Sequence, residues 1–183
     1  MTETPPLVRI SALAAPVLLM FYGVLRLIDG LDGHHDRGLA WNLGHTLFFI
    51  GFVLLGCLLV GVRQLVPAAG WARAVALGAT IVGLVGVACF LWVIVGDLFA
   101  GFRRAAPLPG PLQSFGPVLF QLGALTLLIL LAVVRPRRIP GWSPVFVLGG
   151  FLLYTVDLDL IPVGSLLVLA GLAPLAVARP ALR

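Results

Sequence analysis

Three polar residues in the first apolar stretch, Tyr22, Arg26 and Asp29, follow one another at intervals of four and three residues. On a helix these intervals place all three side chains on one face. A phenol, a guanidinium and a carboxylate together can donate and accept hydrogen bonds and pair with a charged ligand. We therefore predict that the three residues belong to a binding site. The alternative is that Arg26 pairs with an aspartate and only holds helices together.

Three further polar residues, Asn42, Asp97 and Tyr154, lie near the ends of other apolar stretches. Polar and ionisable groups at membrane depth are costly, and they tend to face a cavity or one another. If the stretches are antiparallel helices, these ends meet on one side of the membrane. We predict that Asn42, Asp97 and Tyr154 belong to the same binding site.

Two aspartates and a histidine are candidates for acid–base chemistry at that site. Asp157 and Asp159 lie in the motif DLDLIP, and His45 follows Asn42 by three residues. Aspartate and histidine are common general acids and bases. We assign Asp157, Asp159 and His45 as candidate catalytic residues. We also expect Asp157 or Asp159 to line a polar pocket that opens outward; an ordinary tight turn is the alternative.

Metal and cofactor binding are not expected. His34 and His35 lie in the segment DGHHD (residues 32–36), but its spacing matches no recognised zinc motif. His45 has no second histidine in the apolar stretches with which to ligate haem. The chain also lacks GxSxG, HExxH and a phosphate-binding glycine loop.

The composition is that of a membrane protein. Of the 183 residues, 61% are hydrophobic and 10% are charged, and the mean hydropathy is +1.13. A soluble domain carries about 25% charged residues because water must wet its surface. The isoelectric point is 10.6, yet the basic residues are all arginines, most of them placed in ones and twos at the ends of apolar stretches. We therefore exclude a nucleic-acid partner, whose binding needs clustered basic residues.

Six apolar stretches are the expected membrane spans. They are residues 7–28, 39–62, 74–99, 115–134, 144–156 and 161–178. The last two are divided at DLDLIP, because one helix over both would be about 50 Å long and proline breaks a helix. We expect Ser143 to cap the fifth span. We also expect the third span, which is rich in small residues, to be the central helix.

The predicted fold is therefore an all-α polytopic transmembrane bundle of about six spans. It forms one domain over residues 1–183, and its last two spans form a short hairpin. With alternating spans, eight arginines fall on one side and about four on the other. The positive-inside rule then places both termini in the cytoplasm and all six aspartates on the outer side. The absence of lysine indicates a GC-rich genome, and we expect the bacterial plasma membrane.

Three functions are open at this point. The first is a non-enzymatic component of a membrane assembly, or a binder of lipid or a small amphiphile. Its partners would be membrane lipids, other membrane subunits or a second copy of the chain. The second is a membrane-embedded enzyme that uses the aspartates with Tyr22, Tyr154 and His45 on a lipid or isoprenoid. The third is a proton-coupled secondary transporter. The sequence shows no inverted repeat, which argues against this third function.

Overall fold

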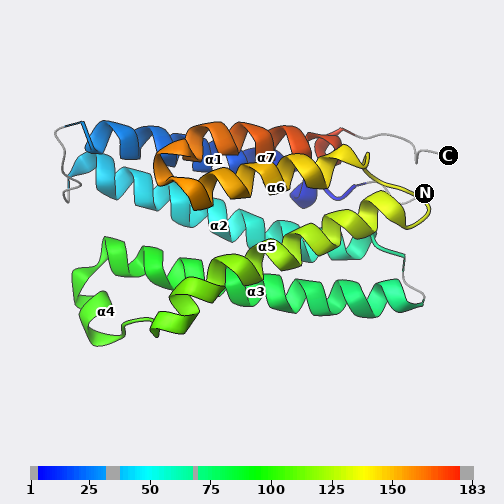
Figure 1. Ribbon diagram of the computed structural model, residues 1–183, viewed down its shortest axis with the longest axis horizontal. Helices are drawn as coiled ribbons and strands as arrows, with labels where there is room; N and C mark the ends of the chain where they lie inside the picture. Colours follow the sequence, from blue (N-terminus) through cyan, green and yellow to red (C-terminus); the bar gives the residue numbers. More distant parts are fainter. Residues whose placement is uncertain (1–3, 32–37, 68–69, 178–183) are drawn as a thin grey trace.

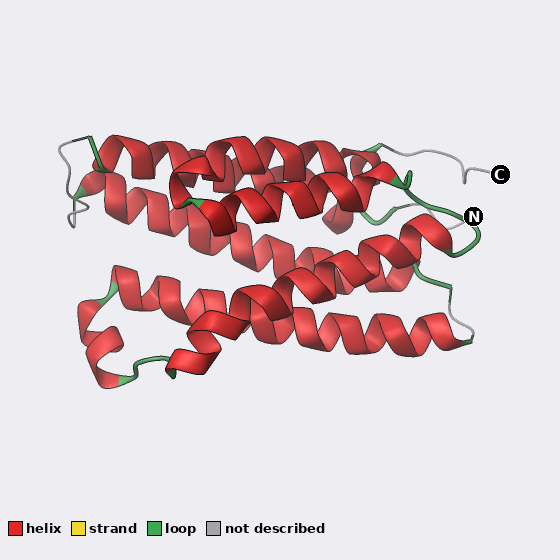
Figure 2. Cartoon of the chain, in the orientation of Figure 1, coloured by secondary structure: helices red, strands yellow, loops and turns green. Residues whose placement is uncertain are grey.

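The computed structural model describes residues 4–31, 38–67 and 70–177, and within these ranges all regular structure is helical (Figure 2). The elements are α1 (Pro6–Asp29), α2 (Leu39–Leu65), α3 (Trp71–Leu98), α4 (Ala100–Ala105), α5 (Gly110–Val133), α6 (Trp142–Val156), the 3₁₀ helix η1 (Leu158–Leu160) and α7 (Ile161–Ala176). The predicted all-α fold is confirmed.

Five helical segments are long and apolar enough to cross a membrane. They are α1, α2, α3, α5 and the segment Leu158–Ala176, which η1 and α7 form together. The remaining predicted span, α6, is apolar but has only 15 residues. Ile10, Ile81 and Leu122 point outward and are each more than half exposed. A bilayer accommodates such apolar surface, whereas soluble proteins rarely present it.

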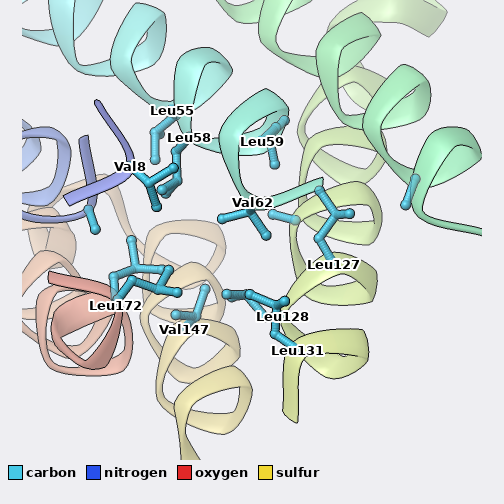
Figure 3. Close-up of a cluster of buried hydrophobic side chains, with 14 of the residues drawn as sticks. Val8, Leu55, Leu58, Leu59, Val62, Leu127, Leu128, Leu131, Val147 and Leu172 are labelled. Atoms are coloured by element: carbon cyan, nitrogen blue, oxygen red, sulfur yellow. The ribbon is translucent and has the colours of Figure 1, made fainter. Parts of the chain in front are cut away.

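The helices form two groups that meet at α2 (Figure 1). On one side of α2, α1 packs against α2 and α7, and α6 packs against α7. On the other side, α3 packs against α2 and α5, and α5 returns to contact α6. Figure 3 shows where the groups join, with Val8, Leu58, Leu127, Val147 and Leu172 directed at one another from five helices. In lipid, such side chains stabilise the bundle mainly through close van der Waals packing.

The predicted break between the last two spans is confirmed. α6 ends at Val156, and α7 begins at Ile161 with Pro162 in its first turn. The Asp157 carboxylate accepts a hydrogen bond from the Asp159 N–H (2.9 Å), which closes the turn between them. With 15 and 16 residues, the two helices are about 22 and 24 Å long, shorter than a hydrocarbon core of about 30 Å.

The turn of this hairpin lies below the end of α1. A Cβ atom at Gly23 would lie 2.6 Å from Cδ of Pro162, so the start of α7 is in contact with Gly23. Gly23 precedes the last residue of α1, Asp29, by six residues. Six residues of helix correspond to about 9 Å. Figure 1 shows the same relation, with the α6–α7 turn stopping short of the end that α1 and α2 reach.

Two expectations about the helices are wrong. Ser143 does not cap α6: the helix begins at Trp142, because Gly141 already has near-helical angles, and Ser143 is fully buried. The third span, α3, is not central. It contacts α2, α4 and α5, whereas α2 separates it from α1. Only some of its small residues face a helix, since Gly78 and Ala88 are exposed.

Candidate functional site

Most of the predicted polar residues meet at one end of the bundle. α1 ends there, α2 begins there and α3 ends there, because α2 runs antiparallel to α1 and α3 on either side of it, and short connections join the three helices. The side chains that this arrangement brings together are Tyr22, Arg26, Asp29, Trp41, His45, Asp97, Arg103 and Asp159. We call these eight residues the polar end.

One ion pair joins α1 to the hairpin turn. Arg26 Nε lies 3.4 Å from Asp159 Oδ1, and the side chains are 20% and 53% exposed. Tyr22, one turn earlier on α1, is buried beside Arg26 and interacts with it. The pair thus connects the last turns of α1 with the recessed start of α7. This geometry is what the alternative interpretation of Arg26, as a link between helices, predicts.

A second set of polar contacts, centred on Asp97, joins α2, α3 and α4. Asp97 Oδ2 lies 3.7 Å from His45 Nε2, and Asp97 Oδ1 lies 3.4 Å from Arg103 Nη1. The indole N–H of Trp41 donates to the Asp97 carbonyl at 3.4 Å. Asp97, on α3, is therefore held by three side chains from two neighbouring helices, α2 and α4.

His45 is enclosed by protein groups on both ring nitrogens. It is 5% exposed, and its Nδ1 lies 2.9 Å from the Trp41 carbonyl oxygen while its Nε2 faces Asp97. The Trp41 ring lies 4.0 Å from the imidazole, and Tyr22 approaches it edge-on at 5.3 Å, both between ring centroids. As placed, neither nitrogen faces a space that a substrate can enter. The contacts of His45 support a role in packing α2 against α3.

The space beside this histidine is too small for a ligand. A gap bordered by Tyr22, Arg26, Asp29 and His45 has a volume of about 10 Å³. One water molecule needs about 10–15 Å³ of such space. The helix face that we predicted as a binding site is therefore packed against α2.

A larger cavity opens on the other side of Asp97. It lies between the end of α3, α4 and the start of α5, and its volume is about 340 Å³. Ligand sites in proteins begin at about this size. Its polar lining residues are Asp97, Arg103 and Gln113. Its apolar lining includes Phe90, Trp92, Phe102, Leu108 and Leu112. We call it the α3–α5 cavity.

Local features of the sequence shape this cavity. Gly96 allows α4 to approach α3, because a Cβ atom there would lie 3.3 Å from Cβ of Arg103. The Trp92 indole N–H donates to the Ala106 carbonyl at 2.9 Å and holds the end of α4. Pro107 and Pro109 then separate α4 from α5. The segment between α3 and α5 therefore folds back over the end of α3.

Three residues that line the cavity, Arg103, Trp92 and Gln113, are not among the site residues predicted from the sequence. Arg103 was counted as a topology signal, and Trp92 and Gln113 lie in segments without an evident polar pattern. One feature of the sequence could have indicated this contact: Asp97 and Arg103 are six residues apart. A reversal of the chain followed by a helical turn can bring two such residues together. Using that feature requires knowing that residues 100–105 form a helix.

Of the predicted site residues, only Asp97 borders the cavity. Three of the others, Asn42, Tyr154 and Asp157, also lie outside the polar end. The Asn42 side chain is exposed, and its carbonyl accepts from the Thr46 hydroxyl (2.7 Å). The Tyr154 hydroxyl lies 2.8 Å from Ser165 Oγ, joining α6 to α7. Asp157 is exposed and closes the hairpin turn.

His34 and His35 lie outside the described residues. Within those ranges, no three histidine, cysteine or acidic side chains are grouped as metal ligands. No family model, no curated protein sequence and no solved structure matches the chain.

Proposed function

We propose that this protein binds a lipid or single-chain amphiphile in the α3–α5 cavity, with the polar head of the ligand at Asp97 and Arg103. The observation that carries the proposal is that one cavity of about 340 Å³ borders both an ion pair and an aromatic and aliphatic wall. With the orientation expected from the arginines, the cavity opens toward the outer leaflet of the bacterial plasma membrane. The chain would be a multi-pass binding protein there, with lipid as its partner.

The lining of the cavity suits a ligand that carries both a positive and a negative charge. The Arg103 side chain is 62% exposed, so it can turn to a phosphate or carboxylate without losing buried contacts. Asp97 offers a carboxylate to an ammonium group, and Gln113 offers both a donor and an acceptor. Trp92 and Leu112 provide apolar surface for the first carbons of a chain. A zwitterionic headgroup matches this set better than a neutral one.

The enzymatic and transport alternatives have less support. His45 faces protein groups through both nitrogens, and Asp157 closes a turn. Asp159 pairs with Arg26 rather than with a second candidate acid or base. Each of these contacts supports a role of the residue in the fold. Neither the α3–α5 cavity nor a second cavity of ligand size, where α5 ends and α6 begins, is lined by the hairpin aspartates.

Filling the cavity should weaken binding of an amphiphile. Ala106 borders the cavity, whereas its neighbour Ala105 is exposed at the end of α4 and does not border it. We expect Ala106→Leu to bind palmitoyl lysophosphatidylcholine about tenfold more weakly than wild type, because the added methyl groups occupy the space of the ligand. Ala105→Leu should bind like wild type. Titration followed by native mass spectrometry measures both.

The results of this titration distinguish a binding protein from an enzyme. Equal binding by wild type and both variants would exclude the α3–α5 cavity as the site. Release of the acyl chain or the headgroup during incubation would support an enzyme instead. Thermal unfolding of each variant shows whether a loss of binding reflects a loss of fold.

A further inference from the structure

A second cavity lies at the opposite end of the bundle, where α5 ends and α6 begins. Its volume is about 450 Å³, and its border includes Ile129, Val133, Arg137, Gly141 and Pro144. This volume is also in the range of ligand sites. It shares no lining residue with the α3–α5 cavity.

The connection between α5 and α6 places a cation at the rim of this cavity. The Arg138 N–H donates to the Leu131 carbonyl at 2.9 Å, and Ile139 is 1% exposed. These contacts turn the connection back against the end of α5. Arg137 remains exposed at the cavity rim. The cavity therefore combines one guanidinium with apolar walls from two helices.

This end of the bundle is positively charged. The described arginines toward this end are Arg9, Arg63, Arg73, Arg135, Arg137 and Arg138. Within the described ranges, the four aspartates, Asp29, Asp97, Asp157 and Asp159, all lie toward the other end. Among the described residues, an anion near Arg137 therefore meets several arginines and no aspartate at this end.

Apolar surface continues from the cavity along both helices. Ile129 and Val133 on α5 and Val145 and Leu148 on α6 are all exposed. Trp142, at the start of α6, is exposed as well. Tryptophan is enriched where membrane and water meet, which places the cavity at the level of lipid headgroups. Acyl chains can lie along the exposed side chains below it.

We propose that this cavity binds the phosphate headgroup of an anionic phospholipid, with Arg137 at the phosphate and the acyl chains along α5 and α6. Basic pockets between transmembrane helices bind such headgroups through the same combination of charge and apolar surface. With the expected orientation, the lipid belongs to the cytoplasmic leaflet. The site is separate from the α3–α5 cavity, and its existence does not depend on the function proposed for that cavity.

Three variants test the site in lipid nanodiscs. Arg137→Gln removes the cation at the rim. Gly141→Leu fills the cavity, and the chain accommodates it because Gly141 has helical angles (φ −64°, ψ −20°) and an added Cβ meets nothing within 4 Å. Arg135→Gln is the matched control, since Arg135 is exposed in the same connection but does not border the cavity.

The measurement is retention of phosphatidylglycerol against phosphatidylcholine with identical acyl chains, by native mass spectrometry. We expect wild type to retain phosphatidylglycerol preferentially, and Arg137→Gln and Gly141→Leu each to reduce that preference about fivefold. Arg135→Gln should match wild type, and inorganic phosphate should not displace the lipid. Equal retention of both lipids, an equal loss in Arg135→Gln, or displacement by inorganic phosphate would overturn the proposal.

Discussion

Replacing Gly86 with alanine should lower the thermal stability of the bundle, whereas the same replacement at Gly78 on the same helix should not lower it. Gly86 lies where α3 crosses α5. A Cβ atom at Gly86 would collide with the backbone nitrogen of Phe120 and lie 2.6 Å from the Gly116 carbonyl oxygen. Backbone atoms cannot turn aside as a side chain can, so the two helices must separate.

The expected loss is about 1–3 kcal/mol in the free energy of unfolding, the usual cost of overpacking. Gly78 is the matched control, because an added Cβ there meets nothing within 4 Å. Both residues lie inside α3, so the effect of alanine on the helix itself is the same in the two variants. Tryptophan fluorescence of the purified protein in detergent gives the unfolding midpoints. Equal midpoints for Gly86→Ala and Gly78→Ala would contradict the close crossing of α3 and α5.

Replacing Asp159 with asparagine should also destabilise the fold, whereas Asp157→Asn should have little effect. Asp159→Asn leaves the Arg26 guanidinium, which is 20% exposed, without the carboxylate that lies 3.4 Å away. Breaking a well-buried pair costs about 3–5 kcal/mol, and we expect about 1–2 kcal/mol here because Asp159 is half exposed. In Asp157→Asn the amide oxygen can still accept from the Asp159 N–H, so the turn is preserved.

A double-mutant cycle isolates the ion pair. The variant with both Arg26→Gln and Asp159→Asn should be more stable than the sum of the single losses predicts, because neither charge is then left alone. Unfolding midpoints of the four proteins provide the coupling energy. Additive losses would show that Arg26 and Asp159 do not interact. A larger loss in Asp157→Asn than in Asp159→Asn would contradict the role assigned to the hairpin turn.

The candidate site was only partly predictable, and particular residues show why. The spacing of Tyr22, Arg26 and Asp29 correctly predicts a shared helix face, but it does not reveal that α2 packs over that face. The sequence marks His45 as a candidate catalytic residue. Its burial between Trp41 and Asp97 depends on the angle between α2 and α3, which no local pattern encodes. The α3–α5 cavity depends on α4, a helix of only six residues in a proline-rich segment.

The sequence by itself determined that the protein is suited to a lipid bilayer and that its secondary structure is helical. Long apolar runs leave few alternatives to helices in a membrane, because every backbone hydrogen bond must be made within the segment. Proline and the two aspartates of DLDLIP likewise determine where the last two helices divide. Only the tertiary structure decided that the hairpin turn lies beside Gly23, that α3 is peripheral, and that Asp97 borders a cavity. These features depend on which faces of the helices meet, and small residues such as Gly78 and Gly86 look alike in sequence although one faces outward and the other faces a helix.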